Sequence, residues 1–146
     1  MIFLEKPKNF EKAIHVVGCF LECDGKILLL LRDSKKDGGD RWGTPGGKVE
    51  IDDVDFESAL IREVFEETGV KIERRDLVNI CVYYVIHPNN KKFIYTKYSI
   101  VLPNKPDVIL REEEHKEFTW ATPEESLKMS LIMHEDFIVK HTYGIK

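Results

Sequence analysis

A short helix with clear start and stop signals is the feature that most constrains how this chain can fold. Asp55 is a good N-cap, because its carboxylate can accept hydrogen bonds from the free amides of a first helical turn. Gly69 suits the position after the last turn, where a left-handed backbone is easiest for glycine. The sequence therefore predicts a helix over residues 56–68. Four apolar side chains share one arc of this helix at about 100° per residue: Leu60, Ile61, Val64 and Phe65.

Three glutamates of the predicted helix, Glu63, Glu66 and Glu67, are spaced i, i+3 and i+4, and we place them on the opposite arc. Like charges at these spacings repel, whereas a divalent cation with a preference for hard oxygen ligands would reverse the effect. Just upstream, Gly46 and Gly47 lack a Cβ, so backbone can approach such a site and a glycine carbonyl could complete a metal shell. A solvated acidic face on an amphipathic helix is the alternative.

The stretch from Gly47 to Val70 resembles the Nudix box, G-x5-E-x7-R-E-U-x-E-E-x-G-U, in which U is a bulky aliphatic residue. Gly47 matches its first glycine, and the run from Arg62 to Val70 matches its second half without a gap. The middle departs from the pattern. Counting forward from Gly47 places the first box glutamate on Asp53, and counting back from Arg62 places it on Val54, so the loop carries one extra residue. We favour Asp53, because the Asp55 cap pins the helix register.

The resemblance implies an α/β protein with a Nudix-like α/β/α sandwich built on a mixed β-sheet. It implies an enzyme that uses Mg²⁺ or Mn²⁺ to hydrolyse a diphosphate linkage in a nucleoside diphosphate attached to another group. Glu63, Glu66 and Glu67 would hold the metal with Gly46 or Gly47, and Arg62 would orient a glutamate of the cluster. The small-molecule partner would be a nucleotide or nucleoside diphosphate derivative.

A second acidic stretch also resembles the family, in which an E-H-x-E-[FY]-x-W strand precedes a capped helix. Residues 114–120 fit this pattern, and Thr122 followed by Pro123 reads as a helix start. In the family, a glutamate near this strand adds a metal ligand or acts as a base. Glu114 and Glu117 are the candidates for these two roles, and the sequence does not choose between them. A final helix is expected over about residues 135–143.

The remaining pattern indicates two pairs of strands. Residues 14–22 and 27–32 flank an Asp-Gly turn, and the second of these is apolar on both faces, as a central strand should be. Residues 78–87 and 93–102 flank the Pro88–Lys91 turn. Strands, helix, strands and helix in this order suit a mixed sheet between helices.

Substrate contacts are expected from two regions. The polar loop 33–41 and basic residues near the glycine pair could grip phosphates, with Arg32, Arg41 and Lys48 as candidates, although the loop could equally be a surface loop with no such role. Aromatic residues crowd the second hairpin and could stack on a base or simply pack across strands; among them we single out Tyr83.

Composition supports a single domain over residues 1–146. The chain is 33% charged and 42% hydrophobic with a net charge of −4, which argues against a nucleic-acid surface. Its N-terminus is charged from Glu5 onward, and its longest aliphatic run, 27–31, is too short for a membrane span. Its three cysteines form no close pair, which fits a reducing cytoplasm. No pattern in the sequence indicates the oligomeric state.

Two other function classes remain open. One is a nucleotide-binding sensor that keeps the Nudix fold after losing box residues, and the three box glutamates speak against it. The other is an isomerase of the isopentenyl diphosphate type, which would need a cysteine and histidine set that the sequence does not show. No second motif identifies the group attached to the nucleoside diphosphate.

Overall fold

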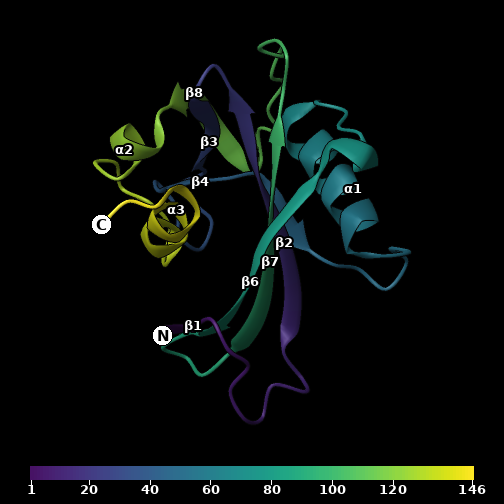
Figure 1. The fold of residues 1–146 in the computed structure, drawn as a ribbon, viewed down its shortest axis with the longest axis vertical. Coiled ribbons are helices and arrows are strands. Elements are labelled where there is room, and N and C mark those ends of the chain that lie inside the picture. The colour runs from purple at the N-terminus through teal and green to yellow at the C-terminus, as the bar shows by residue number, and fades with distance from the viewer.

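The computed structural model describes residues 1–146 and shows a mixed β-sheet between helices (Figure 1). Helix α1 covers one face of the sheet, while α2 and α3 cover the other. The predicted α/β/α sandwich is therefore confirmed. The longest helix has 13 residues, and no helix could cross a lipid bilayer.

The elements are β1 (Ile2–Phe3), β2 (Ile14–Cys23), β3 (Lys26–Arg32), β4 (Trp42–Gly43), β5 (Gly46–Lys48), α1 (Phe56–Thr68), a 3₁₀ turn (Arg74–Asp76), β6 (Val78–Ile86), β7 (Lys92–Val101), β8 (His115–Ala121), α2 (Pro123–Ser126) and α3 (Glu135–Tyr143).

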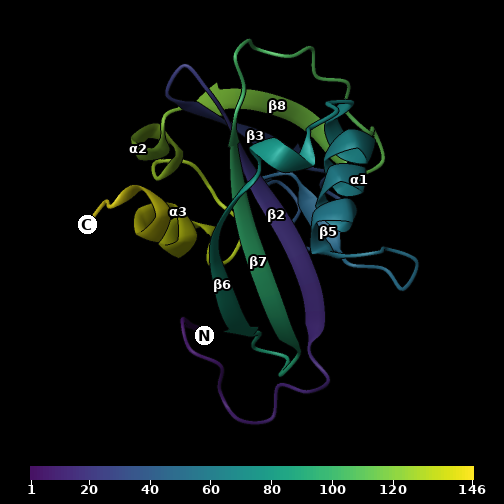
Figure 2. The same ribbon diagram turned by 45° about the vertical axis from the view of Figure 1, so that its right-hand side comes forward.

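The sheet has the order β1-β6-β7-β2-β3-β4, with β5 paired to β2 and β8 paired to β3. Only β2 and β7 run parallel; the other pairs are antiparallel. Figure 2 shows β8 crossing the end of the sheet above β3, and β5 lying beside α1. The two predicted hairpins form, and their strand ends differ from the expected ones by at most one residue.

Alternation along β2 and β3 divides the core between the two faces of the sheet. Val17, Leu28 and Leu30 pack with Leu60 and Val64 of α1. The intervening side chains pack with α3 on the opposite face: Phe20, Ile27 and Leu29. Burial on both faces explains why β3 reads as an unbroken aliphatic run.

The Asp24-Gly25 turn has φ of 52° and 74° at its two residues, the left-handed pair that fits the twist of a hairpin. Three short strands, β1, β4 and β5, were not predicted. Each has two or three residues, which is too few for a repeating pattern to show.

Helix α1 has the predicted ends. The Asp55 carboxylate accepts a hydrogen bond from the Ser58 amide at 2.8 Å, and Gly69 adopts φ 73°. The expected arc needs correction, because Phe65 is 56% exposed and Glu67 only 4% exposed. At about 100° per residue Phe65 lies about 140° around the helix from Leu60, outside the buried arc, whereas Glu67 lies within about 20° of Leu60. One of the three glutamates therefore points into the protein.

A buried ion pair joins the sheet to α3. Lys97 of β7 is fully buried, and its Nζ donates to Glu135 Oε1 at 2.8 Å and to the Thr44 hydroxyl. Burial by itself lowers the pKa of Lys97, but the Glu135 carboxylate, together with Tyr95, raises it above its usual value. Thr44 also donates to Glu135 Oε1 at 3.1 Å, so the three groups form one closed network.

We expect Lys97→Met to destabilise the protein by about 3–5 kcal/mol, because it leaves the Glu135 charge buried without its partner. Lys91→Met at an exposed position should change stability by less than about 0.5 kcal/mol. Urea unfolding of both variants and of the double variant Lys97→Met/Glu135→Leu would measure this. A double variant no more stable than Lys97→Met alone would show that uncompensated charge is not the cause.

Candidate active site

Strand β5 brings the glycine pair against α1. Gly46 and Gly47 pair with Gly18 and Val17 of β2, and the Gly46 amide donates to Glu67 Oε1 at 2.7 Å. A Cβ on Gly46 would lie 2.2 Å from the Val17 carbonyl oxygen, and a Cβ on Gly47 would lie 2.5 Å from the Glu63 carboxyl carbon. Gly46 therefore allows β5 to approach the β2 backbone closely, and Gly47 allows the Glu63 carboxylate to lie against the backbone of β5.

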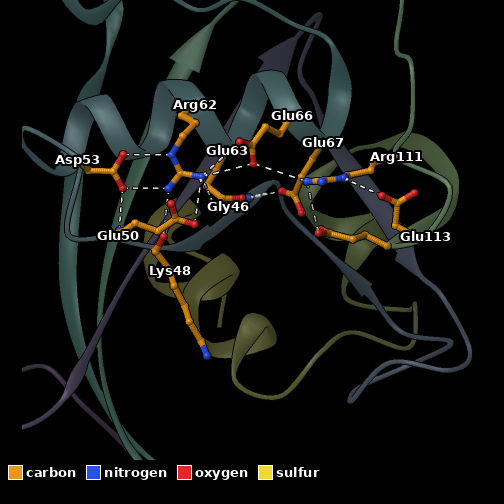
Figure 3. Close-up of polar contacts among 11 residues, drawn as sticks. Gly46, Lys48, Glu50, Asp53, Arg62, Glu63, Glu66, Glu67, Arg111 and Glu113 are labelled. Atoms are coloured by element: carbon orange, nitrogen blue, oxygen red, sulfur yellow. Dashed lines mark hydrogen bonds and ion pairs between the residues drawn. The ribbon is translucent and has the colours of Figure 1, made fainter.

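Arg62 is the cation at the centre of the acidic loop and helix (Figure 3). Its Nε and Nη2 donate to the two oxygens of Asp53 at 3.0 and 2.9 Å, and its Nη1 donates to Glu63 at 3.0 Å and to Glu66 at 3.3 Å. These bonds hold the pKa of Asp53 below its ordinary value. Val54, in contrast, is 90% exposed. Asp53 therefore occupies the place expected for the first box glutamate, and the extra residue is absorbed by the loop.

Glu67 is the most buried carboxyl of the cluster. Burial raises its pKa to about 9, the Gly46 amide opposes that shift, and the nearby Glu63 and Glu114 add to it. Burial also raises the pKa of Glu63, against the effect of Arg62. A carboxylate held in this way is stabilised in its charged form by a cation placed beside it. A metal ion bound by these carboxylate oxygens would supply that cation.

Glu114 and His115 complete a group whose ligand atoms all lie within 4.8 Å of one another, with Glu67 as its third member. Glu114 lies in the turn before β8, so strand alternation does not set its direction, which is why the sequence alone could not choose it. Glu117 is exposed and pairs with Leu31, on the same face of the sheet as Leu29 and therefore opposite α1. The structure brings Glu114, and not Glu117, to the cluster.

A cleft of about 180 Å³ opens beside Glu67 and is lined by Arg32, Thr44, Tyr95, His115 and the glycine pair, among others. A larger hollow of about 470 Å³ lies elsewhere, between residues 9–14 and 90–92. It contains none of the carboxylates discussed above, and its lining is mostly exposed lysine, asparagine and glutamate side chains. We therefore regard the smaller cleft as the candidate site.

The expected substrate contacts divide between the cleft and other parts of the protein. Arg32 lines the cleft, and its Nε donates to the Asp37 carbonyl at 2.5 Å. Lys48 accepts from Arg62 through its carbonyl at 3.3 Å, but its side chain points away from the carboxylates (Figure 3). Arg41 is exposed and does not line the cleft. The expectation for Tyr83 needs correction: it is fully buried among the side chains that pack with α3, and its hydroxyl pairs with His141 Nδ1 at 2.7 Å.

The polar loop between β3 and β4 is tied to β8. Ser34 donates to Asp40 at 2.7 Å, and the Lys116 amine donates to both side chains. The Asp33 amide also donates to the Glu114 carbonyl at 2.8 Å. These bonds hold the loop as a folded turn against β8, the strand that follows Glu114.

His115 was not predicted as a site residue. It lies within the acidic motif of residues 114–120, for which only Glu114 and Glu117 were given a role. It is 6% exposed and lines the cleft, and its Nδ1 has no hydrogen-bond partner. A histidine directly after a candidate metal ligand was the signal available in the sequence.

Comparisons with known proteins give a consistent result. The family model described as NUDIX domain matches residues 12–139. The chain is 34% identical over 124 residues to CTP pyrophosphohydrolase of Escherichia coli (strain K12), an alignment that covers 82% of this chain and 84% of that protein. Among solved structures it is similar to a MutT NUDIX hydrolase from Burkholderia pseudomallei, with 25% identity, a TM-score of 0.77, and coverage of 90% and 98% of the two chains. It is also similar to the E. coli ORF135 protein, with 27% identity, a TM-score of 0.73, and coverage of 95% and 94%.

We expect Asp53→Ala to lower the free energy of unfolding by about 1–3 kcal/mol, because it breaks a nearly buried two-point contact with Arg62. Asp52→Ala, at the exposed neighbouring position, is the matched control and should be close to neutral. A double-mutant cycle with Arg62→Ala measures the coupling. Additive losses would show that the two side chains do not stabilise each other.

Proposed function

Because the chain belongs to the Nudix hydrolase family, we propose that it hydrolyses a diphosphate linkage in a nucleoside triphosphate or another nucleoside diphosphate derivative. Cleavage would yield a nucleoside monophosphate and the phosphorylated remainder, which for a triphosphate is pyrophosphate. CTP is the first substrate to test, because the relative that is 34% identical is a CTP pyrophosphohydrolase. The observation that carries the proposal is the buried Glu67 carboxyl, bound to the Gly46 amide and close to Glu63 and Glu114.

The donor set fits a divalent metal ion. The carboxylates of Glu63, Glu66, Glu67 and Glu114, with a carbonyl of Gly46 or Gly47, would hold it. The Glu63 carboxyl occupies the space beside Gly47 that a Cβ at this position would fill. Mg²⁺ or Mn²⁺ bound here would neutralise the charge of the diphosphate and lower the pKa of an attacking water.

The chain's own residues would arrange this chemistry. Arg62 acts as a positioning residue, because its hydrogen bonds fix the Glu63 and Glu66 carboxylates relative to Asp53. Arg32 lines the cleft and offers a positive charge to the phosphate groups.

The alternative classes find less support. The three box glutamates argue for catalysis over a sensor role. For an isomerase, the cysteines are wrongly placed: Cys19 and Cys23 are buried, and Cys81 packs against the core beneath α3, so none of them lines the cleft.

The proposal is tested by measuring products from a nucleotide panel that includes CTP, the other nucleoside triphosphates and ADP-ribose. We expect turnover with Mg²⁺ or Mn²⁺ and its loss in excess chelator, because carboxylate and carbonyl oxygens dominate the site. Identifying pyrophosphate, rather than orthophosphate, as the product from CTP would locate the broken bond. Undiminished turnover in chelator would overturn the metal assignment.

We expect Glu66→Gln and Glu67→Gln each to reduce kcat by several orders of magnitude while the fold is kept. Glutamine at 67 can still accept the Gly46 hydrogen bond, and neither change adds volume to the core. Asp53→Ala should reduce kcat by a smaller factor, about ten- to a hundredfold, because it acts only through Arg62. Glu57→Gln, on the first turn of α1 and bound to Arg74, is the matched control. Normal hydrolysis by Glu67→Gln together with an early thermal transition would assign that residue to structure alone.

A further inference from the structure

His115 presents a nitrogen to the carboxylates without a partner of its own. Its Nδ1 lies 3.7 Å from Glu67 Oε2, too far for a hydrogen bond but close enough for both atoms to bind one ion. Ligand atoms about 2.1 Å from a common ion can be no more than about 4.2 Å apart, and this pair meets that limit.

The environment of His115 makes a purely structural role costly. The residue is 6% exposed, and leaving a buried ring nitrogen without a hydrogen bond is unfavourable. An apolar ring of similar size would fill the same space without that cost. Backbone pairing with Arg32 already fixes the strand at this position, so the imidazole nitrogen is not needed to hold β8 in place.

We propose that His115 is a ligand of the metal ion held by Glu67 and Glu114, which makes the site a mixed oxygen and nitrogen site. The inference rests on the metal site of the proposed function but adds a residue and a selectivity to it. Imidazole nitrogen favours first-row transition ions, whereas Mg²⁺ favours oxygen ligands. The site should therefore bind Co²⁺ and Mn²⁺ better relative to Mg²⁺ than its carboxylates alone would.

The direct test needs no variant. Pulsed electron paramagnetic resonance of the full-length protein loaded with one equivalent of Mn²⁺ should show modulation from a coordinated ¹⁴N nucleus. The same signal should persist in His87→Ala, which removes a histidine at the far hairpin, and disappear in His115→Phe. Bound Mn²⁺ without nitrogen coupling would overturn the role of His115 and leave the carboxylate site intact.

Calorimetric titrations with Co²⁺ and Mg²⁺ provide the second readout. In His115→Phe, which keeps a ring in the cavity, we expect the Kd for Co²⁺ to rise about ten- to a hundredfold. The Kd for Mg²⁺ should change by less than about threefold. Equal losses for both ions would mean that His115 only positions Glu67, and the proposal would then be wrong.

Two further controls separate the possible failures. His115→Gln provides a second variant if His115→Phe does not fold, and it should show the same selective loss of Co²⁺ binding. If neither ion binds the wild-type protein, the metal site of the proposed function fails together with this inference. If both ions bind and neither binding depends on His115, only the inference fails.

Discussion

The contact of Arg62 with the surrounding carboxylates is the interaction on which the site depends. Residues 50–67 contain eight acidic side chains and one basic one, so loop and helix would repel each other without it. The guanidinium has five donors in a fixed plane, and here they serve Asp53, Glu63 and Glu66 together with the Lys48 carbonyl. One side chain therefore sets the shape of the loop and the direction of the acidic face.

Arg62 does not reach Glu67, and this gap separates two kinds of carboxylate. Glu66 is partly exposed and paired with arginine, whereas Glu67 is buried and bonded to a backbone amide. Burial makes the charged form of Glu67 costly, and the pKa of this carboxyl is raised as a result. The protein meets that cost because α1 is held by its caps and by Leu60 and Val64. Stability from the core thus maintains a carboxyl that is poised for a cation.

Short-range sequence patterns predicted much of this arrangement. The parts that depend on contacts between distant segments were not predicted. The Asp55 cap and Gly69 gave both ends of α1, and the Asp-Gly turn gave the first hairpin, because each depends on neighbouring residues. The choice of Glu114 over Glu117 depends on a turn that precedes β8, and the burial of Tyr83 depends on how α3 packs on the sheet. Such placements arise from contacts between segments far apart in the chain, which a single sequence does not encode locally.

The two faces of the sheet carry different kinds of buried polar group: one face serves stability, and the other holds the candidate active site. Beneath α3, the buried charge of Lys97 is paired with Glu135, and the buried Tyr83 hydroxyl is hydrogen-bonded to His141. Beneath α1, carboxyl groups and one imidazole nitrogen remain under-satisfied. Thr44 connects the two, since it lines the cleft and its hydroxyl bonds to Glu135. The Lys97 network therefore ties the cleft wall at Thr44 to the packed face of the sheet, while Glu67 and His115, which also line the cleft, keep polar atoms available to a ligand.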